Sequence, residues 1–138
     1  MKINRVLFDS DVLIDFLSNR IPYAEHIEKI LLKCGDNLFQ GFITPVIISN
    51  IYYIMRKNEK HEKVIDKLKL LIEIIDVINI DKEVIIKSFN SKFSDFEDAL
   101  QNYSAELNQI DIIVTRNFKD YKNSNLVILT PLELISYL

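Results

Sequence analysis

Short apolar segments alternate with longer segments of helical periodicity along the whole chain. The apolar segments are rich in Val, Ile, Leu and Phe and span residues 5–8, 39–44, 76–80, 111–115 and 126–129. Between them, apolar residues recur at spacings of three and four, which is typical of helices with one buried face. Strands that alternate with helices in this way predict an α/β fold with a parallel sheet.

Polar residues mark where the helices are expected to begin. Asp9 and Asp11 can cap a first helix, and Asp81 can cap the helix that follows residues 76–80. Ser-x-x-Glu and Thr-x-x-Glu spacings at residues 94–97 and 130–133 predict two capping boxes. The helix from residue 45 to about 57 is apolar nearly all round, so we expect it to be largely buried. In the helix after Ser94, the expected apolar stripe is Phe96, Ala99, Leu100, Tyr103 and Leu107.

Composition limits the class of protein. A chain of 138 residues, 49% hydrophobic and 27% charged, predicts one folded domain over 1–138 and excludes a disordered or collagen-like chain. The single cysteine, Cys34, excludes an internal disulfide and favours a cytoplasmic location. A net charge of −3 argues against a general basic clamp on nucleic acid. The uncharged segment 37–55 is interrupted at Thr44-Pro45, so we expect no membrane span.

Acidic residues gather at one predicted edge of the sheet. In open parallel sheets, sites form beyond the carboxyl ends of the strands. Three segments supply polar side chains there: Asp9 and Asp11 after the first strand; Asn117 and Asp120 after residues 111–115; and Asp95, Glu97 and Asp98 at the start of a helix. Like charges repel unless a cation neutralises them, and oxygen ligands alone select Mg²⁺ or Mn²⁺.

Each of these acids also has a structural explanation. Asp9 or Asp11 can serve only as an N-cap, which is worth about 1 kcal/mol. The acids at residues 95–98 lie where a helix dipole favours anions, and Asp120 can be a surface loop residue. Convergence of the three segments is what favours a metal site.

Three sequence phrases resemble those of PIN domains. They are LFDSDVLID at residues 7–15, SDFEDALQ at 94–101 and IVTRNFKDY at 113–121, and LTP at 129–131 is similar to the usual end of the last strand. The resemblance covers nearly the whole chain, from Val6 to about Leu134. It implies a three-layer α/β/α domain with a central, mostly parallel sheet.

The resemblance also implies a function, that of a VapC-like toxin ribonuclease. Asp9 and Asp98 would be the central Mg²⁺ or Mn²⁺ ligands, and Asp120 with Asn117 would supply a further position. A metal-activated water would then hydrolyse RNA phosphodiesters. Arg116 adjoins these residues, and both a phosphate contact and an ion pair with a nearby carboxylate are open to it. We further expect a homodimer and a small antitoxin as partner.

The chain departs from the family pattern at one position. Many PIN domains carry a Glu on the helix after the second strand, where this sequence offers Asn50. Asn50 can ligate a metal through its carbonyl oxygen without bringing charge, or the site can depend on Asp95 or Glu97 instead. A polar group bonded inside a buried helix is the structural alternative for Asn50.

Two other functions remain open at this stage. The departure at Asn50 favours, as an alternative, a scaffold that binds RNA or protein but cleaves poorly. Residues 8–12 also resemble the first motif of haloacid-dehalogenase-type phosphatases, although the later motifs of that class do not follow.

Overall fold

Five parallel strands form a single sheet in the order β3-β2-β1-β4-β5. The computed structural model describes all of residues 1–138. The strands are β1 (Arg5–Phe8), β2 (Gln40–Ile43), β3 (Asp76–Val77), β4 (Ile112–Val114) and β5 (Val127–Leu129). All five predicted strands are therefore present, and the sheet is parallel throughout.

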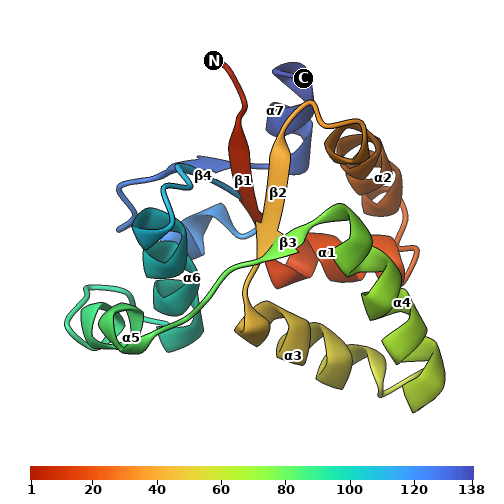
Figure 1. Cartoon of the computed structure of the whole chain (residues 1–138), viewed down its shortest axis with the longest axis horizontal. Helices are drawn as coiled ribbons and strands as arrows, with labels where there is room; N and C mark the ends of the chain where they lie inside the picture. The colour runs from red at the N-terminus through yellow and green to blue at the C-terminus, as the bar shows by residue number, and fades with distance from the viewer.

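Helices cover both faces of this sheet (Figure 1). They are α1 (Ser10–Leu17), α2 (Tyr23–Gly35), α3 (Pro45–Met55), α4 (His61–Ile74), α5 (Lys82–Phe89), α6 (Phe96–Leu107) and α7 (Pro131–Ser136), with a 3₁₀ turn, η1, at Phe118–Tyr121. Helices α5 and α6 lie together on one side, and the other helices lie on the opposite side or below the strands. The fold is thus the expected three-layer α/β/α arrangement.

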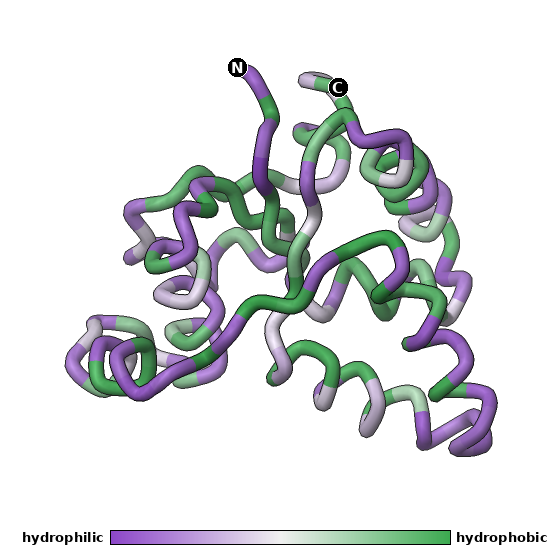
Figure 2. The backbone as a smooth tube through the Cα atoms, viewed as in Figure 1, coloured by the Kyte–Doolittle hydropathy of each residue, from purple (hydrophilic) through white to green (hydrophobic).

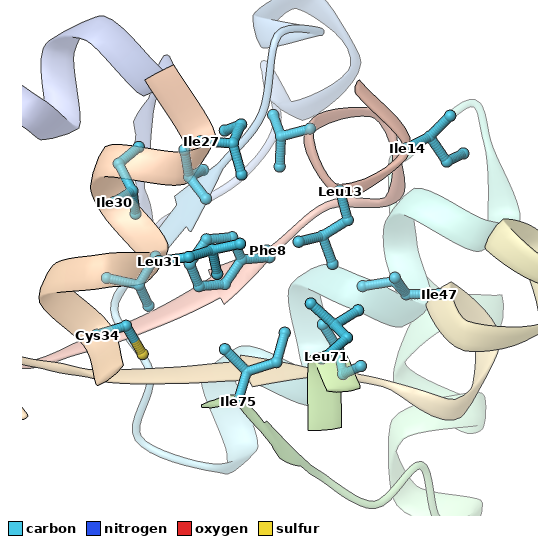
Figure 3. Close-up of a cluster of buried hydrophobic side chains, with 14 of the residues drawn as sticks. Phe8, Leu13, Ile14, Ile27, Ile30, Leu31, Cys34, Ile47, Leu71 and Ile75 are labelled. Carbon is cyan, nitrogen blue, oxygen red and sulfur yellow. The ribbon is translucent and has the colours of Figure 1, made fainter. Parts of the chain in front are cut away.

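Alternating residues of β1, β2, β4 and β5 pack into two separate cores. In β1, Val6 and Phe8 join the larger cluster with α1, α2, α3 and α4, whereas Leu7 joins the smaller one beside α6. Figure 3 shows part of the larger cluster, in which Phe8 lies among side chains of α1, α2 and α4. In contrast, the turn between α3 and α4 is hydrophilic (Figure 2). Burial of both faces explains why the central strands β1, β2 and β4 are largely apolar, whereas both residues of the edge strand β3 are exposed.

Gly41 permits β2 to pack against this core. A Cβ atom at residue 41 would lie 2.6 Å from Cγ2 of Ile75 and 2.8 Å from Cε2 of Phe8. Both neighbours are buried, so neither can withdraw into solvent. Only glycine fits at this place in the sheet.

The helix caps lie at the residues predicted from the sequence, with one exception. Oδ1 of Asp81 accepts the N–H of Val84, and Thr130 forms the expected capping box. The predicted capping box at Ser94 is wrong, because the cap lies one residue later. Asp95 is the N-cap of α6, and its Oδ1 accepts the N–H of Asp98 at 3.0 Å.

Helix α3 is less buried than expected. Only Ile47, Ile51 and Met55 are buried, whereas Tyr53 is 68% exposed. The helix packs on α1 and α4 along one side only, which leaves its other apolar residues at the surface. No helix of the protein is long and apolar enough to span a membrane.

The buried face of α6 also differs from the expected stripe. Ala99 and Leu100 are buried as expected, but Phe96 is exposed. Instead the helix buries polar side chains with distant partners. Oε1 of Gln101 accepts a hydrogen bond from Thr44 of the β2–α3 junction at 2.6 Å. Oδ1 of Asn102 accepts one from Ser124 after η1, so this face of α6 binds two loops rather than an apolar surface.

Candidate active site

Asp9 is a buried carboxylate at the carboxyl end of β1. Because Phe8 pairs with Val114 in the sheet, Asp9 comes to lie beside Thr115, the residue after β4. Its Oδ1 accepts the backbone N–H of Ser10 at 2.8 Å, which caps α1. Its Oδ2 accepts the hydroxyls of Thr115 at 3.0 Å and Tyr121 at 3.2 Å. Asp9 therefore caps α1, which is the structural role that the sequence left open for it. Hydrogen bonds from Thr115 after β4 and from Tyr121 of η1 also hold its carboxylate in place.

Burial makes the negative charge of Asp9 unfavourable. Removal from water, followed by repulsion from Asp11, raises the pKa of Asp9 from 3.8 to about 6, although its hydrogen bonds oppose the rise. Burial and the charge of Asp9 in turn raise the pKa of Tyr121 well above its ordinary value. Tyr121 therefore stays protonated and donates its hydrogen bond to Asp9 at physiological pH.

The charges of the other predicted acids act on Asp98. It occupies the first turn of α6 and is half-buried. Its pKa is raised from 3.8 to about 7, chiefly by burial and then by repulsion from the neighbouring carboxylates Asp95, Asp9, Asp120 and Glu97. The edge of the sheet thus brings the carboxylates of three segments into one negative field, although their role as ligands stays a prediction.

Asn117 and Asp120 lie at the exposed rim of this field. Asn117 is the residue before η1 and Asp120 lies within it, and the backbone N–H of Asp120 donates to the carbonyl of Asn117 at 3.0 Å. The N–H of Asn117 donates to Oγ1 of Thr115 at 3.0 Å. Thr115 therefore links the rim segment directly to Asp9.

Arg116 pairs with a carboxylate of α1. Its guanidinium donates to both oxygens of the fully buried Asp15, at 2.6 and 3.1 Å, and lies over the ring of Tyr23. Its backbone N–H donates to Oδ2 of Asp11 at 2.9 Å. Of the two roles left open for Arg116, the ion pair is therefore formed in the structure, and a contact with phosphate stays a prediction.

Asn50 faces the first turn of α6 rather than the core. Its side chain is half-exposed, and Nδ2 donates to Oε2 of Glu97 at 2.8 Å. The alternative of an amide bonded inside a buried helix does not apply to Asn50.

The donor set of this edge fits a divalent cation. The side chains that hydrogen-bond to Asp9 are the hydroxyls of Thr115 and Tyr121, and no lysine or arginine forms an ion pair with Asp9 or Asp98. No three Asp, Glu, His or Cys side chains of the chain are close enough together to hold one ion by themselves. Mg²⁺ is usually bound through only one or two carboxylates and several waters, so a crowded set of acids is not required.

Two residues of the site were not predicted from the sequence. Thr115 and Tyr121 belong to the phrase IVTRNFKDY, but no role was assigned to them. The register of two adjacent parallel strands is the signal that locates Thr115, since each residue that follows β1 lies beside one that follows β4. No sequence signal locates Tyr121, because only the three-dimensional path of η1 brings its side chain next to Asp9.

Comparison with known proteins agrees with this geometry. A model of the PIN domain family matches residues 5–119. Similar solved structures include VapBC2 from Rickettsia felis bound to a promoter DNA fragment (TM-score 0.69, 14% identity, 91% of this chain and 98% of that chain). They also include a toxin–antitoxin complex from Klebsiella pneumoniae (0.67, 21%, 91% and 97%). A third is VapC20 from Mycobacterium tuberculosis, a toxin that cleaves the sarcin–ricin loop (0.67, 8%, 88% and 98%).

Identities this low show a common fold and no more. Curated protein sequences give no significant match. The family model, in contrast, covers well over half of the sequence and includes the segments that carry Asp9, Asn50 and Asp98. The chain belongs to the PIN domain family.

Proposed function

We propose that the protein is a divalent-metal-dependent endoribonuclease that hydrolyses RNA phosphodiesters, and that it is the toxin of a toxin–antitoxin pair. Membership of the PIN family supports hydrolase activity on nucleic acid and makes the phosphatase interpretation unnecessary. The observation that carries the proposal is the buried carboxylate of Asp9, which shares a negative field with Asp98 and has no cationic partner.

The hydrogen bonds around Asp9 hold its carboxylate in one orientation. Thr115 and Tyr121 both donate to Oδ2, and the N–H of Ser10 donates to Oδ1. Ordinary carboxylates at a helix start need none of these side-chain donors, so the arrangement is typical of a ligand fixed by surrounding groups. The charge of Asp9 acts on Asp98 at the start of α6, and Asp120 and Asn117 are exposed.

Asp9 and Asp98 would hold Mg²⁺ or Mn²⁺ in this proposal, with Asp120, Asn117 or Asn50 at further positions. The cation would supply Lewis acidity toward a phosphodiester and its attacking water. Arg116, at the exposed edge of the ion pair with Asp15, would contact the RNA backbone. The carboxylates would also repel RNA in the absence of the cation, so binding and cleavage of RNA should both require it.

The partners of this chain are proposed from the nature of its neighbours. VapBC2 of Rickettsia felis and the Klebsiella pneumoniae protein are toxin–antitoxin assemblies. We therefore propose a small antitoxin for this chain, and we keep the expectations of a homodimer and a cytoplasmic location. A small protein encoded by the adjacent gene that copurifies with the chain would support the toxin role.

Cleavage of mixed single-stranded RNAs tests the proposed activity. We expect products in the presence of Mn²⁺ or Mg²⁺, none in EDTA, and loss of cleavage in Asp9→Asn and Asp98→Asn. Asp66→Asn, which changes an exposed carboxylate of α4, is the matched control and should cleave normally. RNA binding without cleavage at any metal concentration would instead establish the scaffold function that the departure at Asn50 suggests.

A further inference from the structure

A cavity of about 320 Å³ lies beside the candidate site, at the ends of β4 and β5. Its lining residues come from α2, from the segment after β4 and from the start of α7, and they are Tyr23, His26, Arg116, Thr130, Pro131 and Leu132. We call it the Arg116 cavity. It lies where α2 packs beside α7 (Figure 1). None of the acidic residues of the candidate site lines this cavity, so it is a separate feature of the surface.

The strand order places the Arg116 cavity next to Asp9. Strand β4 pairs with β1 on one side and with β5 on the other. Asp9 directly follows β1, and Thr130 of the cavity directly follows β5, so both lie at the same edge of the parallel sheet. Neighbouring strands are about 4.8 Å apart, which puts the cavity on the order of 10 Å from Asp9. An RNA strand with a phosphodiester at Asp9 can therefore reach the cavity with a nearby nucleotide.

Arg116 brings an unused hydrogen-bond donor to this cavity. Its Nε and Nη2 donate to Asp15, whereas its Nη1 has no hydrogen-bond partner within the protein. Asp15 is shared with Arg20, and Asp11 bonds to the backbone of Arg116 rather than to its guanidinium. The bonds to Asp15 and the ring of Tyr23, 4.1 Å from the guanidinium carbon, hold this group in one orientation. A fixed guanidinium with a free N–H is suited to a phosphate.

The rest of the cavity wall is apolar, with one further free polar group. Pro131, Leu132 and the ring of Tyr23 supply the apolar surface, and Leu132 is 60% exposed. The ring nitrogens of His26 form no hydrogen bond within the protein, whereas the hydroxyl of Thr130 is occupied in the capping box. Small-ligand sites are typically apolar pockets of about 300–1,000 Å³ with a few polar groups that fix orientation. The Arg116 cavity has the size and chemistry of such a site.

We propose that the Arg116 cavity binds one unpaired nucleotide of the RNA, next to the cleaved phosphodiester. The base packs against Pro131 and Leu132, His26 hydrogen-bonds to its polar edge, and Arg116 holds the phosphate. Bases of a duplex are paired and stacked, so only an unpaired nucleotide can enter. This inference rests on the proposed function, since RNA is the substrate proposed there, and it narrows that substrate to RNA that is single-stranded near the cleavage site.

NMR titration of the full chain in EDTA tests the cavity without metal or activity. The ring signals of Tyr23 and His26 report on binding, and the probes are AMP, GMP, CMP, UMP and inorganic phosphate. We expect saturable shifts with at least one nucleotide at millimolar concentration and much smaller shifts with phosphate. Equal shifts with phosphate would show that Arg116 binds an anion only, and an absence of shifts with every nucleotide would show that none binds. Either result would overturn the proposal.

The mutational test uses Leu132 and His26, because Arg116 also holds the buried Asp15. Leu132→Asn should weaken nucleotide binding roughly tenfold, since the base loses an apolar contact. His26→Ala should reduce the differences in affinity among the nucleotides, which a merely structural role of His26 would not do. The matched control is Leu70→Asn, which changes an equally exposed leucine of α4 and should leave binding unchanged. Unchanged affinity in Leu132→Asn, shown to be folded by thermal unfolding, would overturn the assignment.

Cleavage kinetics in Mn²⁺ connect the cavity to RNA. If a nucleotide of the RNA occupies it, Leu132→Asn should raise KM roughly tenfold with little change in kcat. An unchanged KM would assign the cavity to a free nucleotide, which overturns this inference and leaves the nuclease proposal standing. If the unmodified protein binds RNA without cleaving it, the Kd of RNA binding replaces KM and only the proposed activity fails. A protein that neither binds nor cleaves RNA would overturn both.

Discussion

Neutralising Asp9 should make the metal-free protein more stable at alkaline pH while it removes metal binding. The folded state raises the pKa of Asp9 from 3.8 to about 6, so folding favours the protonated acid. Stability is therefore lost as the pH rises from about 4 through about 6, and the loss is complete above that range. Asp9→Asn removes the ionisable group and with it this loss.

The size of the effect follows from the pKa. A rise from 3.8 to about 6 corresponds to roughly 3 kcal/mol of lost stability once the buried carboxyl is ionised. Asparagine offers one acceptor oxygen where Asp9 accepts from Ser10, Thr115 and Tyr121, and the lost hydrogen bond costs about 1 kcal/mol. We therefore expect Asp9→Asn to gain about 1–2 kcal/mol at pH 8. The gain should be about 2 kcal/mol smaller at pH 4.5, where the wild-type carboxyl is mostly protonated.

Urea unfolding in EDTA at pH 4.5 and pH 8 measures this difference. At pH 8, Mn²⁺ should stabilise the wild type and leave Asp9→Asn unchanged, because the ion binds only the native state of a chain that retains its ligand. Asp66→Asn serves as the control and should show the pH dependence of the wild type. An Asp9→Asn variant that is destabilised by the same amount at both pH values would refute the argument, since Asp9 would then act only as a helix cap.

Three further predictions test the interpretation of the fold. Gly41→Ala should cost about 2 kcal/mol in urea unfolding, because its Cβ would overlap buried side chains; a neutral effect would contradict the tight packing of β2. Arg116→Gln should destabilise by about 3 kcal/mol, since the fully buried Asp15 then keeps only its 3.5 Å ion pair with Arg20, and should do so more than Asp15→Asn, which leaves a partly exposed arginine. Asp95→Ala should cost about 1 kcal/mol and Ser94→Ala almost nothing; the reverse order would restore the Ser94 cap.

The sequence predicts the sheet well because both faces of its central strands are buried. Strands β1, β2 and β4 then appear as largely apolar runs, and polar caps such as Asp81 and Thr130 give the starts of the helices. The same logic fails for α3. An apolar helix is buried only where other elements meet it, and no pattern within residues 45–57 indicates that one side, including Tyr53, stays at the surface.

Helix α6 shows a second limit of sequence patterns. Hydrophobic periodicity assumes that buried positions are apolar, but α6 buries Gln101 and Asn102 because each finds a hydrogen-bond partner in a distant loop. Burial of a polar group is unfavourable unless such a partner is present. The partners, Thr44 and Ser124, are 57 and 22 residues away, so no local pattern reveals them.

The candidate site also has a part that the sequence predicts and a part that it does not. Residues that follow strands, such as Asp9 and Asp120, can be assigned to one edge because parallel topology dictates where strand ends meet. What surrounds them depends on side chains that turn toward each other across the fold. Arg116 illustrates this point. Its sequence context left both a phosphate contact and an ion pair open, and only the buried position of Asp15 on α1 reveals that the ion pair is formed. Because Arg116 pairs with Asp15, no arginine or lysine pairs with Asp9, and a bound metal ion is our proposal for what balances the charge of Asp9.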